Sequence, residues 1–346
     1  MKEKLILIFG GRSAEYEVSL LSVYNVSAAL DRQKYDVIRI GMTKEGVWYL
    51  YTGDDAKIRS GEWVNDTENC LPLSLIPQKG IRVDATGEIF DKSIPVFPVV
   101  HGSYCEDGRL QGLLDMCGFD YVGPGTAASA VCMDKYITKL IISHRKIPMA
   151  DFVLVHRGNS EDDIIPKVEE KLSYPVFVKP ANAGSSVGAS KVKSREELIA
   201  AVNEARRFDD KVLVEEYIKG REIEVAVMGN DEPFASRPGE ICPNSEFYDY
   251  NTKYISDTAT YFIPAELPEE ISEKIRGYAL KIYRALCCKG LSRVDFFVRG
   301  DEVFFNEINT LPGFTSISMY PSLMQDHGFT YSGVVEELFR YAKEGR

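Results

Sequence analysis

Residues 292–309 read SRVDFFVRGDEVFFNEIN. Two runs rich in branched and aromatic residues, Val294 to Val298 and Val303 to Ile308, are separated by Arg299-Gly300-Asp301. Such runs around a glycine-containing turn predict a β-hairpin. The phenylalanines in both runs favour burial of the two strands. We therefore expect the fold to be built on an antiparallel pair in this region.

Two carboxylates and an amide stand on the predicted hairpin. Glu307 and Asn309 are separated by one residue on a strand, so they share a face. The glycine turn places Asp295 opposite Asn306 and within about one residue of Glu307. Oxygen ligands of this kind suit Mg²⁺, which leaves room for phosphates. The alternative is a solvated strand face, but buried carboxylates without a partner are costly, which favours a nearby cation.

A second motif, KPANAGSSVG at residues 179–188, follows the predicted strand Val176 to Val178. Successive backbone N–H groups in such a loop can form an anion-binding concavity, to which Lys179 adds a positive charge. The chain has no GxxxxGK[ST] motif, so this is not a Walker loop. A glycine-serine loop without a ligand is the alternative interpretation.

The N-terminal region has a third candidate site. Leu5 to Phe9 is an apolar run closed by two glycines, and the helical pattern Ser19 to Leu30 and the strand pattern Tyr35 to Ile40 follow. This order predicts a parallel α/β unit. The GxGxxG spacing of dinucleotide sites is missing. Glu15 would repel a pyrophosphate but could hold an ammonium group, or it could simply favour the start of the helix.

Further elements are predicted along the chain. Pro95 to Val100 is a buried strand that leads into His101, and a helix is expected over Ala127 to Ser143. The stretch Arg237 to Pro268 has weak periodicity and predicts a long loop, which is usually functional or disordered. His101 and Arg293 could each be structural, as a buried histidine and as an ordinary ion-pair partner. The remaining patterns predict strands at 153–155, 212–216 and 222–227, and helices at 195–207 and 333–343.

Composition restricts the class of protein. The chain has 346 residues with 41 basic and 52 acidic side chains, and its net charge is −11. This acidity argues against nucleic acid or an anionic membrane as the main partner. Seven cysteines without CxxC spacing fit free thiols in a reducing compartment. The apolar run at the start is too short for an export signal and no run could span a bilayer, so we expect a cytoplasmic protein.

Together these residues resemble the D-alanine–D-alanine ligase family of the ATP-grasp superfamily. The likeness runs from Gly10 to about Pro321 in seven ordered motifs: GGRSAEYEVSL, HGSYCEDGRLQG, MDKYITK, KPANAGSSVG, EFYDYNTKY, SRVDFF and NEINTLPGFTSISMYP. It implies an α/β fold, α+β in the ATP-binding part, with ATP held between two antiparallel sheets. The implied domains are an N-terminal parallel-sheet domain at 1–122, a central domain at 123–214 and a C-terminal catalytic domain at 215–346.

The resemblance also implies roles for particular residues. The residues expected to contact ATP are Lys135, Lys179, Ser185, Ser186, Glu215, Tyr217, Ile218, Glu222 and Lys253. The residues expected to bind two Mg²⁺ (or Mn²⁺) ions are Asp295, Glu307 and Asn309. The catalytic set is Glu15, Ser185, Tyr254, Arg293 and Lys253. The residues expected to bind the two D-alanines are Glu15, His101, Gly313, Ser318 and Met319. Arg293 and the backbone of Gly313 are expected to stabilise the oxyanion.

The activity implied is the ATP-dependent joining of two D-alanines through D-alanyl phosphate, for peptidoglycan precursors, by a homodimer. Tyr254, where lactate-type relatives have His, argues for an amino acid as second substrate. Met319, where D-serine-type relatives have Arg, favours D-alanine over D-serine. Cys105 replaces a glycine of the family pattern, which leaves the backbone of its loop in question, and Ala183 replaces an acid of some members. The alternatives are a D-alanine–D-serine ligase, another ATP-grasp ligase, an inactive nucleotide-binding relative and a dehydrogenase.

Overall fold

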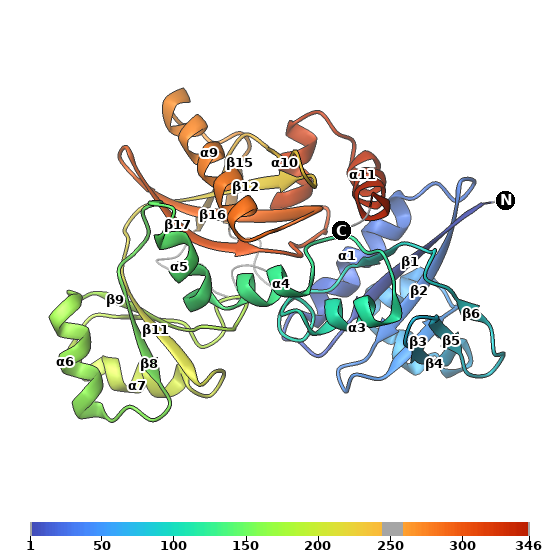
Figure 1. Cartoon of the computed structure of the whole chain (residues 1–346), viewed down its shortest axis with the longest axis horizontal. Helices are drawn as coiled ribbons and strands as arrows, with labels where there is room; N and C mark the ends of the chain where they lie inside the picture. The colour runs from blue at the N-terminus through green and yellow to red at the C-terminus, as the bar shows by residue number, and fades with distance from the viewer. Residues whose placement is uncertain (1, 244–258, 345–346) are drawn as a thin grey trace.

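A computed structural model describes residues 2–243 and 259–344, which form three β-sheets flanked by helices (Figure 1). Lys253 and Tyr254 lie outside the described residues, as does the whole motif EFYDYNTKY that contains them. Within the described ranges, no helix is both long and apolar enough to cross a bilayer.

The N-terminal sheet has seven strands in the order β6-β5-β4-β3-β2-β1-β7. Only β2, β1 and β7 are parallel, and the other four pair antiparallel. The sheet is therefore mixed, and the expectation of a parallel sheet was too simple. Helix α1 supplies the crossover that a parallel pair needs, whereas β2 reaches β3 through a short turn. The strands are β1 (Glu3–Gly10), β2 (Tyr35–Met42), β3 (Trp48–Tyr51), β4 (Cys70–Ile76), β5 (Gly80–Val83), β6 (Ile89–Phe90) and β7 (Val96–Pro98).

Helices cover this sheet and enclose its core. Residues 5–9 of β1 are completely buried, as expected for a central strand with helices on its faces. The helical elements of this region are α1 (Tyr16–Ala29), α2 (Asp55–Ser60), the 3₁₀ turns η1 (Glu62–Asn65) and η2 (Thr67–Asn69), and α3 (Arg109–Cys117).

Two short helices lead into the second sheet, where the sequence predicted a single helix over 127–143. They are α4 (Thr126–Met133) and α5 (Lys135–Ser143). Asp134 separates them because it adopts an extended backbone and its side chain accepts the N–H groups of Tyr136 and Ile137. An aspartate in this N-cap role starts a new helix.

The central sheet is antiparallel, with four strands in the order β10-β9-β11-β8. Its apolar face packs on two helices through residues such as Val168 and Leu198. The predicted domain boundary at 214/215 falls inside β11. The elements are β8 (Phe152–His156), α6 (Glu161–Lys171), β9 (Val176–Pro180), β10 (Ser190–Val192), α7 (Arg195–Ala205) and β11 (Lys211–Glu216).

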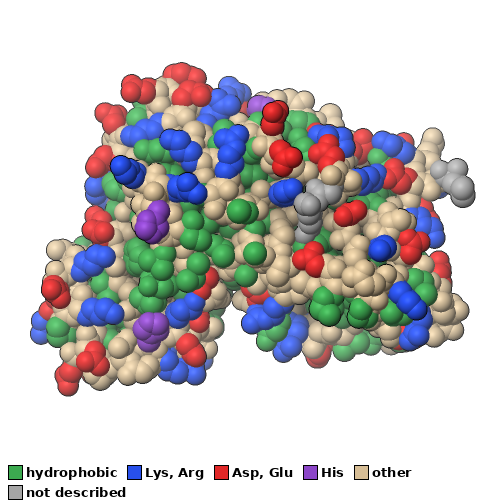
Figure 2. Space-filling view, viewed as in Figure 1, with side chains coloured by type: hydrophobic (Ala, Val, Ile, Leu, Met, Phe, Trp, Pro, Cys, Tyr) green, Lys and Arg blue, Asp and Glu red, His purple; other side chains and the backbone are tan. Residues whose placement is uncertain are grey.

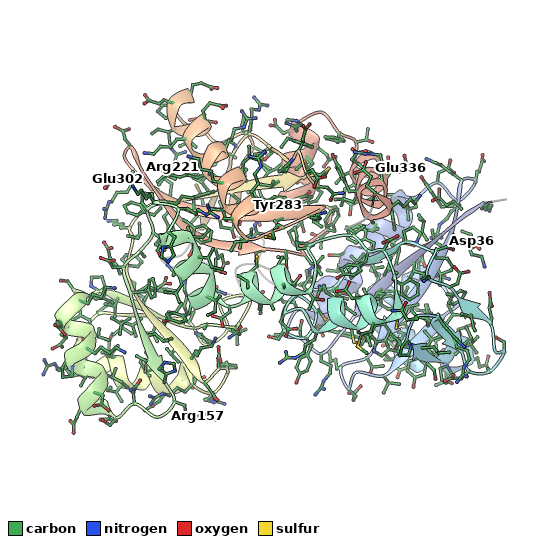
Figure 3. The ribbon with its side chains drawn as sticks, in the orientation of Figure 1. Asp36, Arg157, Arg221, Tyr283, Glu302 and Glu336 are labelled. Carbon is green, nitrogen blue, oxygen red and sulfur yellow. The ribbon has the colours of Figure 1, made fainter. Side chains whose placement is uncertain are left out.

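The third sheet is also antiparallel and follows the path β15-β14-β12-β16-β17, with β13 beside β12. Helix α9 covers one face, where Tyr283 is fully buried and donates a hydrogen bond to the Gly229 carbonyl (2.7 Å; Figure 3). The elements are β12 (Arg221–Met228), β13 (Phe234–Ala235), β14 (Gly239–Pro243), β15 (Ala259–Phe262), α9 (Glu269–Ala285), β16 (Leu291–Arg299), β17 (Glu302–Asn309), α10 (Met319–Asp326) and α11 (Tyr331–Lys343).

The predicted hairpin is confirmed as β16–β17, with one change of register. Asp295 lies opposite Glu307, not Asn306, because a bulge follows Asp295 on the path to Phe296. The expectation of a loop over 237–268 was wrong for its described ends, since β14 and β15 pair antiparallel there.

The C-terminal helix α11 packs beside the N-terminal sheet rather than on the third sheet alone (Figure 1). Phe339 meets Phe97 of β7 edge to face, with ring centroids 5.9 Å apart. Glu336, labelled in Figure 3, pairs with Lys34 at 3.0 Å. Thus one apolar core spans the N-terminal sheet, α10 and α11.

Candidate active site

Two cavities lie where the three sheets meet. The larger has a volume of about 790 Å³, within the range usual for small-molecule sites, and the smaller about 140 Å³. Ser185 and Glu307 line both, so the cavities adjoin. Figure 2 shows a notch in the lower outline of the molecule, between the lobe of the central sheet and the N-terminal region.

The structure gathers nearly all the described candidate residues at these cavities. The larger cavity is lined by Glu15, His101, Ser185, Arg293, Glu307, Asn309, Gly313, Ser318 and Met319. The smaller is lined by Lys135, Lys179, Ser185, Ser186, Glu215, Tyr217, Ile218, Glu222 and Glu307. Asp295 lies behind this lining and contacts it through Arg293 and Asn309.

Glu15 precedes α1 and meets the glycine-serine loop of the central sheet. Its Oε1 accepts a 2.5 Å hydrogen bond from the Ser185 hydroxyl. Gly184 permits this approach, since a Cβ there would lie 2.8 Å from Glu15 Oε2. Gly102, which has a φ of +73°, would likewise collide with the same oxygen if it carried a side chain. Glu15 therefore reaches the junction of the two cavities, with one carboxylate oxygen bonded and the other close to backbone.

The glycine-serine loop has an unusual backbone. Ser185 and Ser186 are both in the left-handed region, with φ of +48° and +58°. Residues other than glycine rarely take this conformation, and it concentrates at ligand sites. Lys135 donates from Nζ to the Ala183 carbonyl (2.7 Å) and lies 3.3 Å from Glu307 Oε2. The loop, a lysine and an acid of β17 thus converge.

A buried group of charges lies under the smaller cavity. Glu215 Oε2 is 2.8 Å from Lys179 Nζ, and its Oε1 is 3.1 Å from Lys139 Nζ. Burial by itself raises the pKa of Glu215, but Lys139 and Lys179 together bring it below its usual value. Both oxygens of Glu215 are therefore committed to lysines, and its contacts suit the positioning of Lys179 better than a direct contact to ribose.

Three carboxylates form a row across neighbouring strands. Glu224 of β12 lies opposite Asp295 of β16, which lies opposite Glu307 of β17. Arg293 is bound by two of them: Asp295 accepts from its Nε (2.8 Å) and Nη2 (2.7 Å), and Glu224 Oε2 is 2.9 Å from Nε. Burial opposes the charge, yet the two acids hold the pKa of Arg293 well above its usual value. Arg293 therefore presents a fixed positive charge to the larger cavity.

Asn309 fits a role beside a cation. Its amide NH₂ donates to Asp295 Oδ2 (2.9 Å), which turns its oxygen away from that contact. With Glu307 on the same strand, this supplies the hard oxygen ligands that Mg²⁺ prefers. No group of three or more His, Cys, Asp or Glu side chains is arranged to hold a metal among the described residues. The donor set thus suits an ion that takes few protein ligands and completes its shell with phosphate and water.

The segment after β17 carries the other candidates. Gly313 lies close to Ser318, whose hydroxyl accepts from the N–H of Thr315 (3.0 Å) and bonds its hydroxyl (2.8 Å). Met319 begins α10 and is 4% exposed, next to Gly239 of β14. Gly313, Ser318 and Met319 line the larger cavity.

Cys105 does not require the backbone of a glycine. Besides its glycines, the residue of its loop in the left-handed region is Tyr104, with a φ of +67°. Cys105 is completely buried, and its sulfur occupies space left by Gly11, where a Cβ would lie 2.7 Å from Sγ. The loop accommodates cysteine because its neighbour has no side chain.

The residues of the site that escaped the sequence analysis include four with polar or charged side chains. Glu106 and Glu224 line the larger cavity, Lys139 lines the smaller one, and Ser22 bonds His101. Two signals were available: Lys139 is four residues from Lys135 on a helix, and Glu224 is two from Glu222 on a strand, so each pair shares a face. Ser22 and Glu106 gave no comparable signal.

A lysine-lined cavity between two antiparallel sheets, beside a row of carboxylates, defines an ATP-grasp protein. Family models match both parts of the chain: "D-ala D-ala ligase N-terminus" over residues 4–124 and "D-ala D-ala ligase C-terminus" over 141–340. The chain belongs to the D-alanine–D-alanine ligase family.

Individual relatives agree with this placement. A D-alanine–D-alanine ligase of Clostridium acetobutylicum is 47% identical, covering 99% of this chain and 98% of the relative. Among solved structures, the VanG D-Ala:D-Ser ligase from Enterococcus faecalis has a TM-score of 0.90 at 39% identity, covering 99% and 100% of the two chains. The D-alanine–D-alanine ligase from Coxiella burnetii has a TM-score of 0.87 at 34% identity, covering 99% and 94%.

Proposed function

We propose that this protein joins two D-alanines in an ATP-dependent reaction that passes through D-alanyl phosphate. The observation that carries the proposal is the Ser185–Glu15 hydrogen bond, which brings the nucleotide-side loop to an acid in the adjoining cavity. A carboxylate is a poor electrophile, and phosphorylation gives it a leaving group. The acid to be activated must therefore lie beside the nucleotide, as this junction allows.

In the first step, the carboxylate of one D-alanine attacks the terminal phosphate of ATP, the bond between the β- and γ-phosphates breaks, and ADP leaves. Glu15 would hold the ammonium of that D-alanine, with His101 behind it, while Lys135, Lys179 and the backbone of Ser185 and Ser186 offset the phosphate charge. The nucleoside end would contact Tyr217, Ile218 and Glu222. Lys253 is proposed as a further phosphate contact.

Mg²⁺ (or Mn²⁺) would be held by Glu307, Asn309 and Asp295, and we propose two such ions. When bound, they would neutralise phosphate charge. The protein side of the arrangement is the hairpin itself, which keeps these oxygens in line across β16 and β17.

In the second step, the amine of the other D-alanine attacks the acyl phosphate, and phosphate leaves. The fixed charge of Arg293 and the N–H of Gly313 would stabilise the tetrahedral oxyanion, which is the effect of aimed donors in a site closed to water. Ser318 would bind the carboxylate of the second D-alanine, and Met319 would border its side chain. Tyr254 completes the proposed triad with Glu15 and Ser185.

The decisive measurement is phosphate release from ATP and Mg²⁺ with D-alanine alone, then with D-serine or D-lactate added, and with the products separated. D-Ala–D-Ala from D-alanine alone is expected. Turnover that requires D-serine would instead assign the protein as a D-alanine–D-serine ligase. Absence of turnover with every D-amino acid would refute the proposal.

The preference between D-alanine and D-serine is tested at Met319. Its closeness to Gly239 leaves little space, and Met319→Arg adds a donor and a charge where the second substrate is expected. We predict that this variant shifts the product ratio toward D-Ala–D-Ser about tenfold, which corresponds to about 1.4 kcal/mol. Met319→Leu, similar in size and uncharged, is the control and should keep the wild-type ratio. An unchanged ratio in Met319→Arg would contradict the assignment.

We also propose a domain division, an oligomeric state and a cellular location. The domain division at 1–122, 123–214 and 215–346 is one, with its second boundary better placed after Glu216, where β11 ends. The homodimer is another and is tested by light scattering on the purified chain. Location in the cytoplasm is the third, tested by fractionation of cells that express the protein.

A further inference from the structure

The backbone that follows β17 is held by side chains from the N-terminal region. Leu311 lies two residues before Gly313, the proposed oxyanion donor. Its carbonyl accepts a hydrogen bond from His101 Nδ1 (2.8 Å), and its N–H donates to Glu106 Oε1 (2.8 Å). The other oxygen of Glu106 accepts the N–H of Gly102 (2.6 Å). Both polar groups of one residue are thus bound by a loop about 200 positions earlier in the chain.

A second attachment lies on the other side of Gly313. The N–H of Phe314 donates to Ser22 Oγ of α1 (3.1 Å), and Ser22 Oγ lies 3.2 Å from His101 Nε2. A carbonyl can only accept, so Nδ1 of His101 carries the proton toward Leu311, and in the neutral ring Nε2 accepts from Ser22. Both ring nitrogens are therefore used in holding this segment, rather than in donating to a substrate.

Glu106 differs from two other acids of the larger cavity. Glu224 and Glu307 each lie beside a cation, Arg293 and Lys135 respectively. Across residues 2–243 and 259–344, Glu106 has backbone N–H groups as its hydrogen-bond partners and no lysine or arginine within ion-pair distance. An acid buried in a cavity wall without a cation is costly to ionise. By accepting their N–H groups, Glu106 holds the backbone at Gly102 and at Leu311 in place.

We propose that Glu106 is a positioning residue: together with His101 it clamps Leu311, and so sets where the Gly313 N–H and the Ser318 hydroxyl lie relative to Glu15. The inference rests on the proposed function in one respect, the role of Gly313 and Ser318. The clamp joins the loop after β7, which contacts α1 through His101 and Ser22, to the segment that carries the second-substrate groups. A misplacement of about 1 Å between such groups can cost about 100-fold in rate.

The clamp predicts a particular kinetic pattern. Glu106→Met leaves the Leu311 N–H without an acceptor, whereas Glu106→Gln keeps one amide oxygen that can still accept from it. We expect kcat to fall about 100-fold in the Met variant and about tenfold in the Gln variant. The KM for ATP should change less than about threefold, because Lys135 and Lys179 lie on other elements. Loss of structure alone would instead lower the melting temperature and leave the kcat of the folded fraction unchanged.

A matched control lies on the same loop. Asp107 also accepts backbone N–H groups, from Tyr104 (2.7 Å) and Arg109 (3.2 Å), but has no contact with Leu311. Asp107→Asn should keep kcat within about twofold. A Glu106→Met variant with a kcat within twofold of wild type, or with a KM for ATP that rises as far as kcat falls, would overturn the proposal.

Amide hydrogen exchange tests whether the clamp holds this segment, without an activity assay. The peptide covering 310–318 should exchange at least about tenfold faster in Glu106→Met than in the wild type or Asp107→Asn. Unchanged exchange would refute the clamp. Faster exchange in a protein whose wild type forms no D-Ala–D-Ala would support the clamp and place the failure in the proposed function.

Discussion

Glu15 shows how much a single residue depends on its neighbours. Its carboxylate lies beside Gly102 and Gly184 and accepts from Ser185, so three segments of the chain must be in place before it can receive a ligand. A glycine at each close approach lets backbone come to an acid where a side chain would collide. The position of this acid follows from packing more than from its own helix.

We predict that Glu15→Gln lowers kcat/KM for D-alanine about 100-fold, because a neutral amide cannot pair with the substrate ammonium. Thermal stability should stay close to that of the wild type. Glu88→Gln, an exposed change of the same kind near Lys4, serves as the control and should have no effect. An unchanged KM for D-alanine in Glu15→Gln would argue against its proposed role.

Glu106 also makes stability depend on pH. Burial, and secondly the charge of Glu15, raise the pKa of Glu106 to about 8 from a usual value of 4.5. Between these values the unfolded chain gives up this proton and the folded chain keeps it, so the free energy of unfolding falls as pH rises. We predict a loss on the order of a few kcal/mol between pH 5 and about 8. Urea unfolding at a series of pH values measures this loss. The free energy of unfolding of Glu106→Gln should fall less steeply with pH than that of the wild type, and an equal fall in the two proteins would contradict the prediction.

Helix α5 is the element that brings cations to the site. Asp134 ends α4 and starts α5, and the new helix presents Lys135 and Lys139 one turn apart on one face. Had α4 and α5 been one helix, as the sequence suggested, no cap would have fixed this start. The N-cap therefore determines where the two lysines enter the smaller cavity.

We predict that Glu215→Gln destabilises the protein by about 3–5 kcal/mol, because it leaves the buried ammonium of Lys139 without its acid. The KM for ATP should also rise, since Lys179 loses a partner at 2.8 Å. Chemical unfolding and initial-rate kinetics measure the two effects. Adding Lys139→Met should restore much of the stability but not the KM. If the double variant is no more stable than Glu215→Gln, the buried charge is not the cause.

At the scale of the whole molecule, α11 ties the last part of the chain to the first. Phe339 is 3% exposed against Phe97 of β7, and both belong to the core that also contains Phe314. The same packing sets the segment after β17 against α1, where Ser22 and His101 hold it. The larger cavity therefore depends on contact between the two ends of the fold.

We predict that Phe339→Ala lowers the free energy of unfolding by about 3–5 kcal/mol, the usual cost of an aromatic cavity. It should also raise hydrogen exchange in β7 and in residues 310–318. Phe208→Ala, at a ring that is 47% exposed, is the control and should cost less than about 1 kcal/mol. Equal losses in the two variants would show that α11 does not stabilise the shared core.

The sequence by itself determined the local elements and the motifs that they carry. Strand β1, the β16–β17 hairpin and the loop at 179–188 were readable because apolar periodicity and turn residues act within a few positions. The family likeness then identified candidate residues that the structure places in the lining of the two cavities. These signals are local, or repeat as fixed motifs, and need no knowledge of packing.

Only the tertiary structure decided how those motifs meet. The row that Glu224 joins is settled by the pairing of β12 with β16, and the place of β7 in the first sheet by its pairing with β1, strands that lie far apart in the chain. The Glu106–Leu311 contact spans 205 positions. No local pattern encodes such a contact, because it forms only when the cores that carry its two partners have packed against each other.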